Sequence, residues 1–365
     1  METHDAETGR HGDAEKGRKT WAMATTTERL GVGIRGAGQV SYEHARAIEK
    51  NPHLYLAAVC SRSEESAGKL ANQFNREAKV YGDYGDLLSD PRVDIVSICM
   101  PNYLHAREAI QALKAKKHLI LEKPVAIHFE ELQDLRTAAR KANTCSVVSF
   151  VLRWHPMVKN LRVLLGQRAI GDVYYTEVDY WHGIKKTFAS YNWIRFKEFA
   201  GGAMITGGCH AADLARYLKG EEVEEVFAYR CKKREDFDYD TTLVASVKFR
   251  DGSVGKLSAS LDGLCFPYQL NIDLLGTEGA IRDNRVYSKR FFPEQTDFVT
   301  LPLATPNTGA VAHHPFQEEI DNLVEKILHG TPVLSDILDA CNSTEVVLAI
   351  EESARTGKPV NVKGT

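Results

Sequence analysis

The sequence has no long apolar run, little net charge and no closely paired cysteines, and each absence excludes a class of protein. Its 365 residues contain no segment close to the roughly 20 apolar residues that a membrane-spanning helix needs. The formal net charge is only −3, with both signs interspersed, so neither nucleic acid nor an anionic membrane is an expected partner. The seven cysteines are scattered and odd in number, which predicts a reducing, cytoplasmic location, no disulfide framework and no metal site.

The length of the chain predicts two domains after an N-terminal extension. Residues 1–29 are polar, carry both charge signs and lack the apolar segment of a secretory signal, so we interpret them as disordered. Met23 lies near their end and could serve as an alternative start. Residues 30–150 are expected to form the first domain and residues 151–365 the second, whose final helix could pack back on the first.

The first domain alternates between short apolar runs and helix-like segments. Strands are expected at 30–34, 54–60, 93–99, 118–121 and 145–150, and helices at 42–50, 64–75, 104–116 and 130–142. This alternation is typical of a parallel sheet of the Rossmann type, in which ligands bind at the carboxyl ends of the strands.

The second domain changes to strands with few helices between them. After a helix at 157–166, strands are expected at 173–181, 223–231, 242–249, 254–261 and 268–275. Apolar residues recur at every second position of 242–249, which predicts a mainly antiparallel sheet covered on one side. The other face holds Thr, Ser, Tyr and Val, so we hypothesise that it is a subunit contact. The expected fold class is therefore α/β.

A glycine-rich turn follows the first expected strand and precedes the first helix. Counted from Gly36, it reads G-x-G-x-x-S, with Gly38 as the second glycine and Ser41 in place of the third. Such a turn points backbone N–H groups and a helix N-terminus at a pyrophosphate, so Gly36, Gly38, Gln39 and Val40 are expected to bind a dinucleotide. An ordinary tight turn is the alternative.

The second expected strand ends at Ser61 and Arg62, without the acidic residue that would bind the ribose hydroxyls of NAD. Arg62 could instead bind the 2′-phosphate of NADP through its fork of donors. The cofactor is therefore expected to be NAD or NADP, with a slight preference for NADP. A solvated arginine at the start of a surface helix explains the same residue.

Two further strand ends carry polar residues that could face the same site. Pro101 and Asn102 follow the strand at 93–99, with His105 shortly after, and Glu122 and Lys123 follow the strand at 118–121. An amine held at that place can accept the proton of an alcohol that is being oxidised. His105 could contact the nicotinamide or ribose, or could cap its own helix.

A glycine-rich segment in the second domain leads to His210, which starts an amphipathic helix. A helix N-terminus disfavours the cationic form of histidine, so a neutral imidazole is expected. Such a ring can both donate a hydrogen bond to a sugar hydroxyl and accept one. A capping or core histidine is the alternative.

Together these pieces resemble the Gfo/Idh/MocA oxidoreductases, the family of glucose–fructose oxidoreductase and inositol dehydrogenase. The resemblance extends from Leu30 to Val362, and the following motifs carry it: the glycine turn, Cys99-Met100-Pro101-Asn102 with His105, Glu122-Lys123-Pro124, Ile170-Gly171-Asp172-Val173, Gly208-Cys209-His210-Ala211-Ala212-Asp213, Leu275-Gly276-Thr277-Glu278-Gly279-Ala280 and the segment from Ser353 to Val360. It implies a large open sheet in the second domain, hydride transfer between a nicotinamide and a ring carbon, and assembly into homo-oligomers through that sheet.

The resemblance also implies roles for individual residues. Lys123 would accept the proton, and His210 would hold or help to deprotonate the substrate hydroxyl. The family commonly has an aspartate four residues before this histidine, where this chain has Thr206. We expect Thr206 to hydrogen-bond the substrate without supplying negative charge, and Arg153 and Trp181 to supply further substrate contacts.

The expected substrate is a sugar, cyclitol or glycoside, oxidised at a secondary hydroxyl such as C3 of a glucoside. Two alternatives remain open at this point. One is a redox glycosidase that retains its NAD and releases an aglycone without net reduction of the cofactor. The other is a non-catalytic sensor that binds the dinucleotide and regulates a partner.

Overall fold

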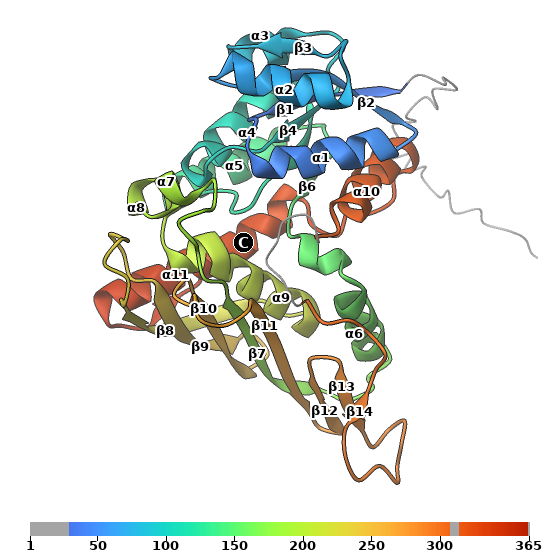
Figure 1. Cartoon of the computed structure of the whole chain (residues 1–365). Coiled ribbons are helices and arrows are strands. Elements are labelled where there is room, and N and C mark those ends of the chain that lie inside the picture. The colour runs from blue at the N-terminus through green and yellow to red at the C-terminus, as the bar shows by residue number, and fades with distance from the viewer. Residues whose placement is uncertain (1–28, 307–313, 364–365) are drawn as a thin grey trace, which may run out of the picture.

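The computed structural model describes residues 29–306 and 314–363, which form two domains (Figure 1). The expectation of a disordered extension with an alternative start at Met23 falls outside the described residues, apart from Arg29. The first domain is drawn in blue and teal at the top of Figure 1, and the second forms the large sheet below it.

The first domain is a six-stranded parallel sheet in the order β3-β2-β1-β4-β5-β6, which confirms the expected Rossmann arrangement. Its strands are β1 (Leu30–Arg35), β2 (Leu54–Cys60), β3 (Lys79–Tyr81), β4 (Ile95–Ile98), β5 (His118–Leu121) and β6 (Ser146–Val148). Its helices are α1 (Gln39–Lys50), α2 (Glu64–Phe74), α3 (Tyr84–Ser89), the short 3-10 turn η1 (Asn102–Leu104), α4 (His105–Lys114) and α5 (Phe129–Lys141).

The sequence did not predict β3 or α3. Strand β3 has three residues, none of them buried, so it offers no run long enough for a periodic pattern. The other boundaries lie within a few residues of those expected. The order of the sheet places the ends of β1 and β4 side by side, and the chain leaves these two strands on opposite faces. A crevice for ligands opens at this point of such a sheet.

The second domain contains a nine-stranded sheet in the order β14-β13-β12-β11-β7-β10-β9-β8-β15. All neighbouring strands are antiparallel except the pair β7 and β10, which confirms the expected mainly antiparallel sheet. The strands are β7 (Val173–Trp181), β8 (Val223–Cys231), β9 (Thr242–Phe249), β10 (Val254–Ser260), β11 (Gln269–Gly276), β12 (Gly279–Arg282), β13 (Arg285–Ser288), β14 (Val299–Thr300) and β15 (Val360–Asn361).

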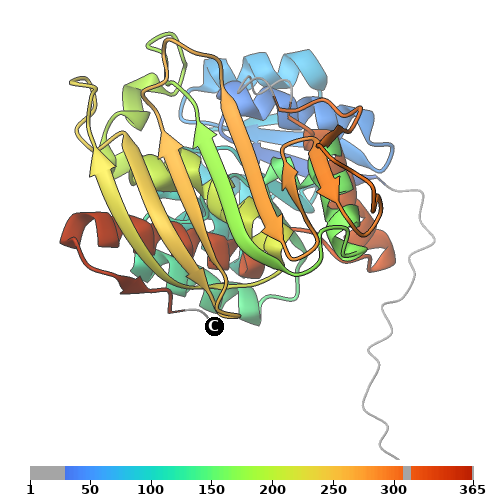
Figure 2. The same cartoon turned by 90° about the horizontal axis from the view of Figure 1, so that it is seen from below.

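Helices cover one face of this sheet and leave the other face open. The helical segments of this domain are η2 (Val151–Trp154), α6 (Pro156–Gly166), α7 (Tyr191–Ile194), α8 (Lys197–Ala200), the π-helix η3 (Met204–Gly208), α9 (Cys209–Lys219), α10 (Phe316–His329) and α11 (Ile337–Thr356). α9 packs on β7, and α11 packs on β8. Figure 2 shows the opposite face of the sheet with no helix across it.

The last two helices return to the first domain. α10 lies against α1, and its apolar side chains Ile320 and Leu323 share a buried cluster with Ile34 and Ile48 (Figure 1). α11 lies between the sheet and α5, where Arg136 and Glu345 form a buried ion pair of 2.6 Å. The two domains are therefore joined by packing as well as by the chain at residue 150.

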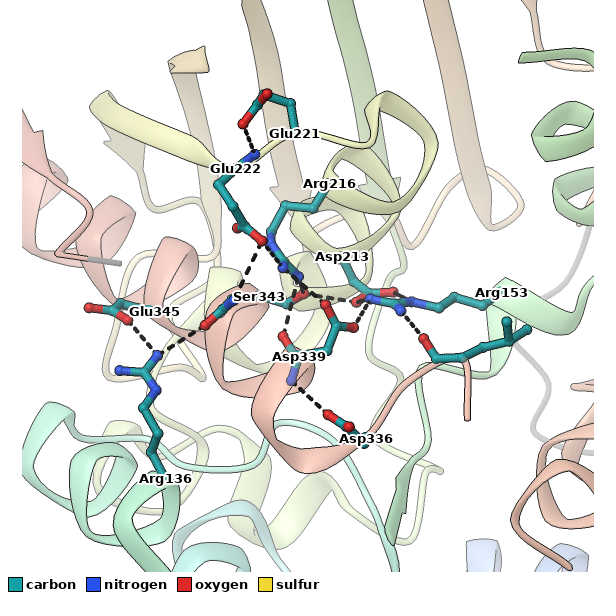
Figure 3. Close-up of polar contacts among 12 residues, drawn as sticks. Arg136, Arg153, Asp213, Arg216, Glu221, Glu222, Asp336, Asp339, Ser343 and Glu345 are labelled. Atoms are coloured by element: carbon teal, nitrogen blue, oxygen red, sulfur yellow. Dashed lines mark hydrogen bonds and ion pairs between the residues drawn. The ribbon is translucent and has the colours of Figure 1, made fainter. Parts of the chain in front are cut away.

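A buried ionic cluster connects η2, α9 and α11 (Figure 3). The Arg153 guanidinium donates to both carboxylate oxygens of Asp213, at 2.9 and 2.5 Å, and lies 2.6 Å from Asp339. Arg216 binds Asp339 at 3.0 Å and also pairs with Glu222. Arg153, an expected substrate contact, has a side chain that is 3 % exposed, and its charge is satisfied within the cluster.

Replacing Arg153 with alanine is expected to lower the free energy of unfolding by about 3–5 kcal/mol, because it leaves the buried carboxylate of Asp213 without its partner. Chemical denaturation measures this change. The control is Arg168→Ala, which breaks a pair with Asp172 whose side chains are 57 % and 72 % exposed, and should cost about 0–1 kcal/mol. A stable Arg153→Ala protein with a raised KM for substrate would contradict the structural role.

Candidate functional site

One cavity of about 1260 Å³ runs along the carboxyl ends of the Rossmann strands and continues onto the inner face of the second sheet. It begins at the glycine turn, passes Pro101 and Lys123, and reaches Tyr180 and His210. A pocket for one drug-sized ligand occupies roughly 300–1,000 Å³. This cavity is therefore large enough for a dinucleotide and a small substrate together.

The glycine turn has the shape that a bound pyrophosphate requires. Gly36 adopts φ +104°, and a Cβ atom there would lie 2.3 Å from the carbonyl oxygen of Cys99, so only glycine fits. A Cβ on Gly38 would meet no atom within 4 Å, because that position faces the open cavity. No side chain caps the N-terminus of α1, which leaves its N–H groups free for an anion. The residues present therefore fit a dinucleotide.

The end of β2 lies in the same cavity. Ser61, Arg62 and Ser66 line it, and no acidic side chain of this strand end does. Arg35, at the end of β1, is held by Glu108 through hydrogen bonds of 3.0 and 2.9 Å, so its charge is already balanced. Arg62 is therefore the cation of this strand end that remains for a ligand.

The loop after β4 forms hydrogen bonds to the second domain. Pro101 and Asn102 line the cavity, and the Asn102 amide donates to Ala200 O at 3.0 Å and to Thr206 Oγ1 at 3.2 Å. His105, an expected cofactor contact, does not line the cavity. Its ring nitrogens lie 2.7 Å from Pro124 O and 2.6 Å from Met100 O, so the ring fixes the loop that carries Lys123.

Glu122 and Lys123 face different partners although they are adjacent in the chain. The Glu122 carboxylate lies 3.1 Å from Nε2 of His44, whose other ring nitrogen lies 2.8 Å from Ser97 Oγ. Burial alone would raise the pKa of Glu122, but the hydrogen bond and charge of His44 bring it below its usual value. Lys123 Nζ donates to the backbone oxygen of Thr206 at 3.2 Å, and its peptide bond to Pro124 is cis.

His210 lies in the cavity as a neutral ring. Burial, and then the charge of Lys123, lower its pKa well below the usual value. The imidazole stacks on Tyr180 with ring centroids 5.1 Å apart, and its Nδ1 has no hydrogen-bond partner among the described residues. The neutral state agrees with the sequence prediction, although the main cause is burial rather than the helix N-terminus.

Thr206 lines the cavity, but its side chain is already engaged. The hydroxyl donates to Ala200 O at 2.9 Å and accepts from Asn102. The backbone oxygen, not the hydroxyl, faces Lys123. A hydroxyl used in this way has little capacity left for a substrate, in contrast to the expected role.

Trp181, an expected substrate contact, lies on the face of β7 opposite to the side chains that line the cavity. Trp181 does not line the cavity, and its indole nitrogen donates to Ser258 at 2.8 Å. Its neighbours Tyr180 and His182 face the cavity instead. The alternation of side chains along a strand was the signal that could have separated these neighbours.

The sequence reading missed other residues of the cavity wall. Lys185 and Tyr268 line the substrate end, and Tyr268 meets His182 with ring centroids 5.5 Å apart. Lys185 follows β7, and Tyr268 precedes β11, which pairs with β7. No local pattern marks either residue, because only the pairing of these two strands brings them together.

Comparison with known proteins gives matches over both domains. A model described as "Oxidoreductase family, NAD-binding Rossmann fold" matches residues 30–150, and one described as "Oxidoreductase family, C-terminal alpha/beta domain" matches residues 162–362.

No helix within the described ranges is long and apolar enough to cross a membrane.

Individual relatives share about a quarter of their residues with this chain. Myo-inositol 2-dehydrogenase of Thermotoga maritima is 27% identical over 257 residues, which cover 68% of this chain and 74% of that protein. Levoglucosan dehydrogenase of Pseudarthrobacter phenanthrenivorans is 28% identical over 331 residues, covering 80% and 83%. The solved structure of a levoglucosan dehydrogenase in complex with NADH shares the fold, with a TM-score of 0.83 and 24% identity over 93% of this chain and 100% of that chain.

Proposed function

The chain belongs to the Gfo/Idh/MocA oxidoreductase family, and from this premise we propose that it oxidises a secondary hydroxyl of a sugar, cyclitol or glycoside. The observation that carries the proposal is the meeting of Lys123 and His210 in one cavity with the glycine turn. Relatives named for myo-inositol and levoglucosan support a polyol or sugar as the substrate class.

The specific position that we propose is C3 of a glucoside. Aromatic side chains, among them Tyr180, Phe188 and Trp193, surround the substrate end of the cavity. Flat apolar faces of this kind pack well against a sugar ring or an aglycone.

The two site residues have complementary roles in the proposed reaction. A bound nicotinamide supplies the acceptor for the hydride. Lys123 accepts the proton of the substrate hydroxyl, and the backbone oxygen of Thr206 holds its amine in place. The neutral ring of His210 orients the same hydroxyl, because an imidazole can donate through one nitrogen and accept through the other.

Replacing Lys123 with alanine is expected to lower kcat by about 10²–10⁴, because the proton then has no positioned acceptor. The measurement is the initial rate of formation of reduced nicotinamide over a panel of free sugars, inositols and aryl glycosides, with NAD and with NADP. Lys69→Ala, which removes an exposed partner of Glu65, is the control and should keep full activity.

Near-normal turnover by folded Lys123→Ala protein would contradict the proposed role of Lys123 as the proton acceptor. Release of aglycone without net reduction of the cofactor would instead identify a redox glycosidase. A protein that binds the dinucleotide and turns over no polyol would be a sensor.

For the cofactor, we propose that NADP is accepted at least as well as NAD. The family is NAD-binding, and in this chain the end of β2 presents Ser61, Arg62 and Ser66 to the cavity. A guanidinium and two hydroxyls can bind a phosphate, whereas the ribose hydroxyls of NAD are usually held by a carboxylate.

Arg62→Ala is therefore expected to raise the KM for NADP about tenfold, since a lost charge-assisted contact of about 1.5 kcal/mol corresponds to that factor. The KM for NAD should change less than about twofold. Steady-state kinetics with each cofactor measure both values, and Arg76→Ala, an exposed arginine outside the cavity, is the control. Equal effects on the two cofactors would contradict a phosphate contact.

The open face of the nine-stranded sheet is the proposed contact between copies of the chain. Tyr229, Val244 and Val254 are exposed large apolar residues on β8, β9 and β10, and no helix crosses this face of the sheet (Figure 2). Exposed apolar residues gathered on one face commonly mark an interface between subunits.

Sedimentation of the purified protein is expected to show a dimer or larger species. Val244→Glu should shift it towards the monomer, because it buries a charge in the apolar contact. Val163→Glu, at an exposed position of α6 away from the sheet, is the control and should leave the assembly intact. A monomeric wild-type protein would refute the proposed interface.

The proposed location remains the cytoplasm. All seven cysteines are unpaired thiols, and Cys231 and Cys265 are exposed. Exposed free thiols persist in a reducing compartment.

A further inference from the structure

The substrate end of the cavity contains lysines and almost no carboxylates. Among the described residues that line the cavity, the carboxylates are Glu108 and Glu122. Glu108 binds Arg35 at the dinucleotide end, and Glu122 binds His44. The segment 307–313, which precedes the cavity residue His314, contains neither Asp nor Glu in its sequence.

The two lysines at this end have no acidic partner in the described part of the chain. Lys123 donates to the uncharged backbone oxygen of Thr206. Lys185 is exposed at the cavity wall, next to His182. The charge of Lys185 therefore has no carboxylate partner among the described residues, in contrast to Arg35, which is paired with Glu108 at the other end.

The pKa values of His182 and His210, which line this end of the cavity, are lowered by burial and by the lysine charge. Burial, and then Lys123, bring the pKa of His182 to about 4, with a further contribution from Lys185. Burial and then the charge of Lys123 also lower the pKa of His210. Both rings are neutral at pH 7 and add polar contacts without adding charge.

We propose that the polyol substrate carries an anionic group, a carboxylate or a phosphate, and that Lys185 binds it beside His182 and Tyr268. The inference rests on the proposed function and narrows its substrate class. A lysine at a cavity wall recognises such a group as a point charge.

Matched substrates test the proposal: glucose, glucuronate and glucose 6-phosphate, and a methyl glucoside with its glucuronide. The wild-type protein should show a kcat/KM at least tenfold higher for an anionic member than for its neutral partner, and the preference should fall with added salt. A higher kcat/KM for glucuronate would identify a carboxylate as the recognised anion, and a higher kcat/KM for glucose 6-phosphate would identify a phosphate. Preference for the neutral members would overturn the inference and leave the proposed function intact.

Lys185→Gln should remove at least fivefold of this preference by raising the KM for the anionic member. Lys186→Gln is the matched control, because Lys186 is also exposed but does not line the cavity. If Lys185→Gln keeps the full preference, the assignment of Lys185 is wrong.

A binding measurement separates this inference from the proposed function. If no member is oxidised, the proposed function fails, and thermal unfolding with the reduced dinucleotide then decides the inference. A larger increase in Tm with glucuronate or glucose 6-phosphate than with glucose, lost in Lys185→Gln, supports an anion site. Equal increases overturn it.

Discussion

The geometry of the site depends on the hydrogen bonds between Asn102 and the segment from Ala200 to Thr206. The Asn102 amide, which is buried, donates to Ala200 O and to Thr206 Oγ1. Lys123 adds a third bond from the first domain to the backbone of Thr206. Because these donors follow β4 and β5 and the acceptors lie near the π-helix η3, they hold the ends of the parallel strands against the segment that leads into His210. Displacing one domain against the other would leave buried polar groups unsatisfied.

The same hydrogen bonds define what Thr206 can do. Its hydroxyl is directed at Ala200 O and Asn102, and its backbone oxygen is directed at Lys123. The position that we expected to contact the substrate therefore organises the protein instead. In the proposed function, the substrate is recognised by the neutral ring of His210 and by tyrosine and lysine side chains that line the same cavity, rather than by an acidic group.

The sequence was sufficient for the parts of the fold that depend on local pattern. The strands of the Rossmann sheet and the alternation in β9 follow from apolar periodicity, and Gly36 and Lys123 fall at strand ends that the topology brings together. Arg153 could not be placed in this way, because its partners Asp213 and Asp339 are distant in sequence and meet it only after α9 and α11 pack. His105 was ambiguous for the same reason, since both of its carbonyl partners belong to loops. Trp181 is a different case, because the sequence already contained the relevant signal: period two along β7 separates it from its cavity-facing neighbours.

The charges around Lys123 are arranged so that no neighbouring carboxylate can take over its role. Glu122 precedes it in the chain, but its oxygen lies 3.1 Å from His44, and the hydrogen bond and charge of His44, with the charge of Lys123, hold the pKa of this carboxyl below its usual value. Glu108 is held by Arg35 at the other end of the cavity. His210 is neutral, chiefly because it is buried. In the proposed reaction the proton of the substrate hydroxyl therefore passes to the Lys123 amine. In the proposed reaction the ammonium formed there donates to the backbone oxygen of Thr206 and interacts with the charge of Glu122.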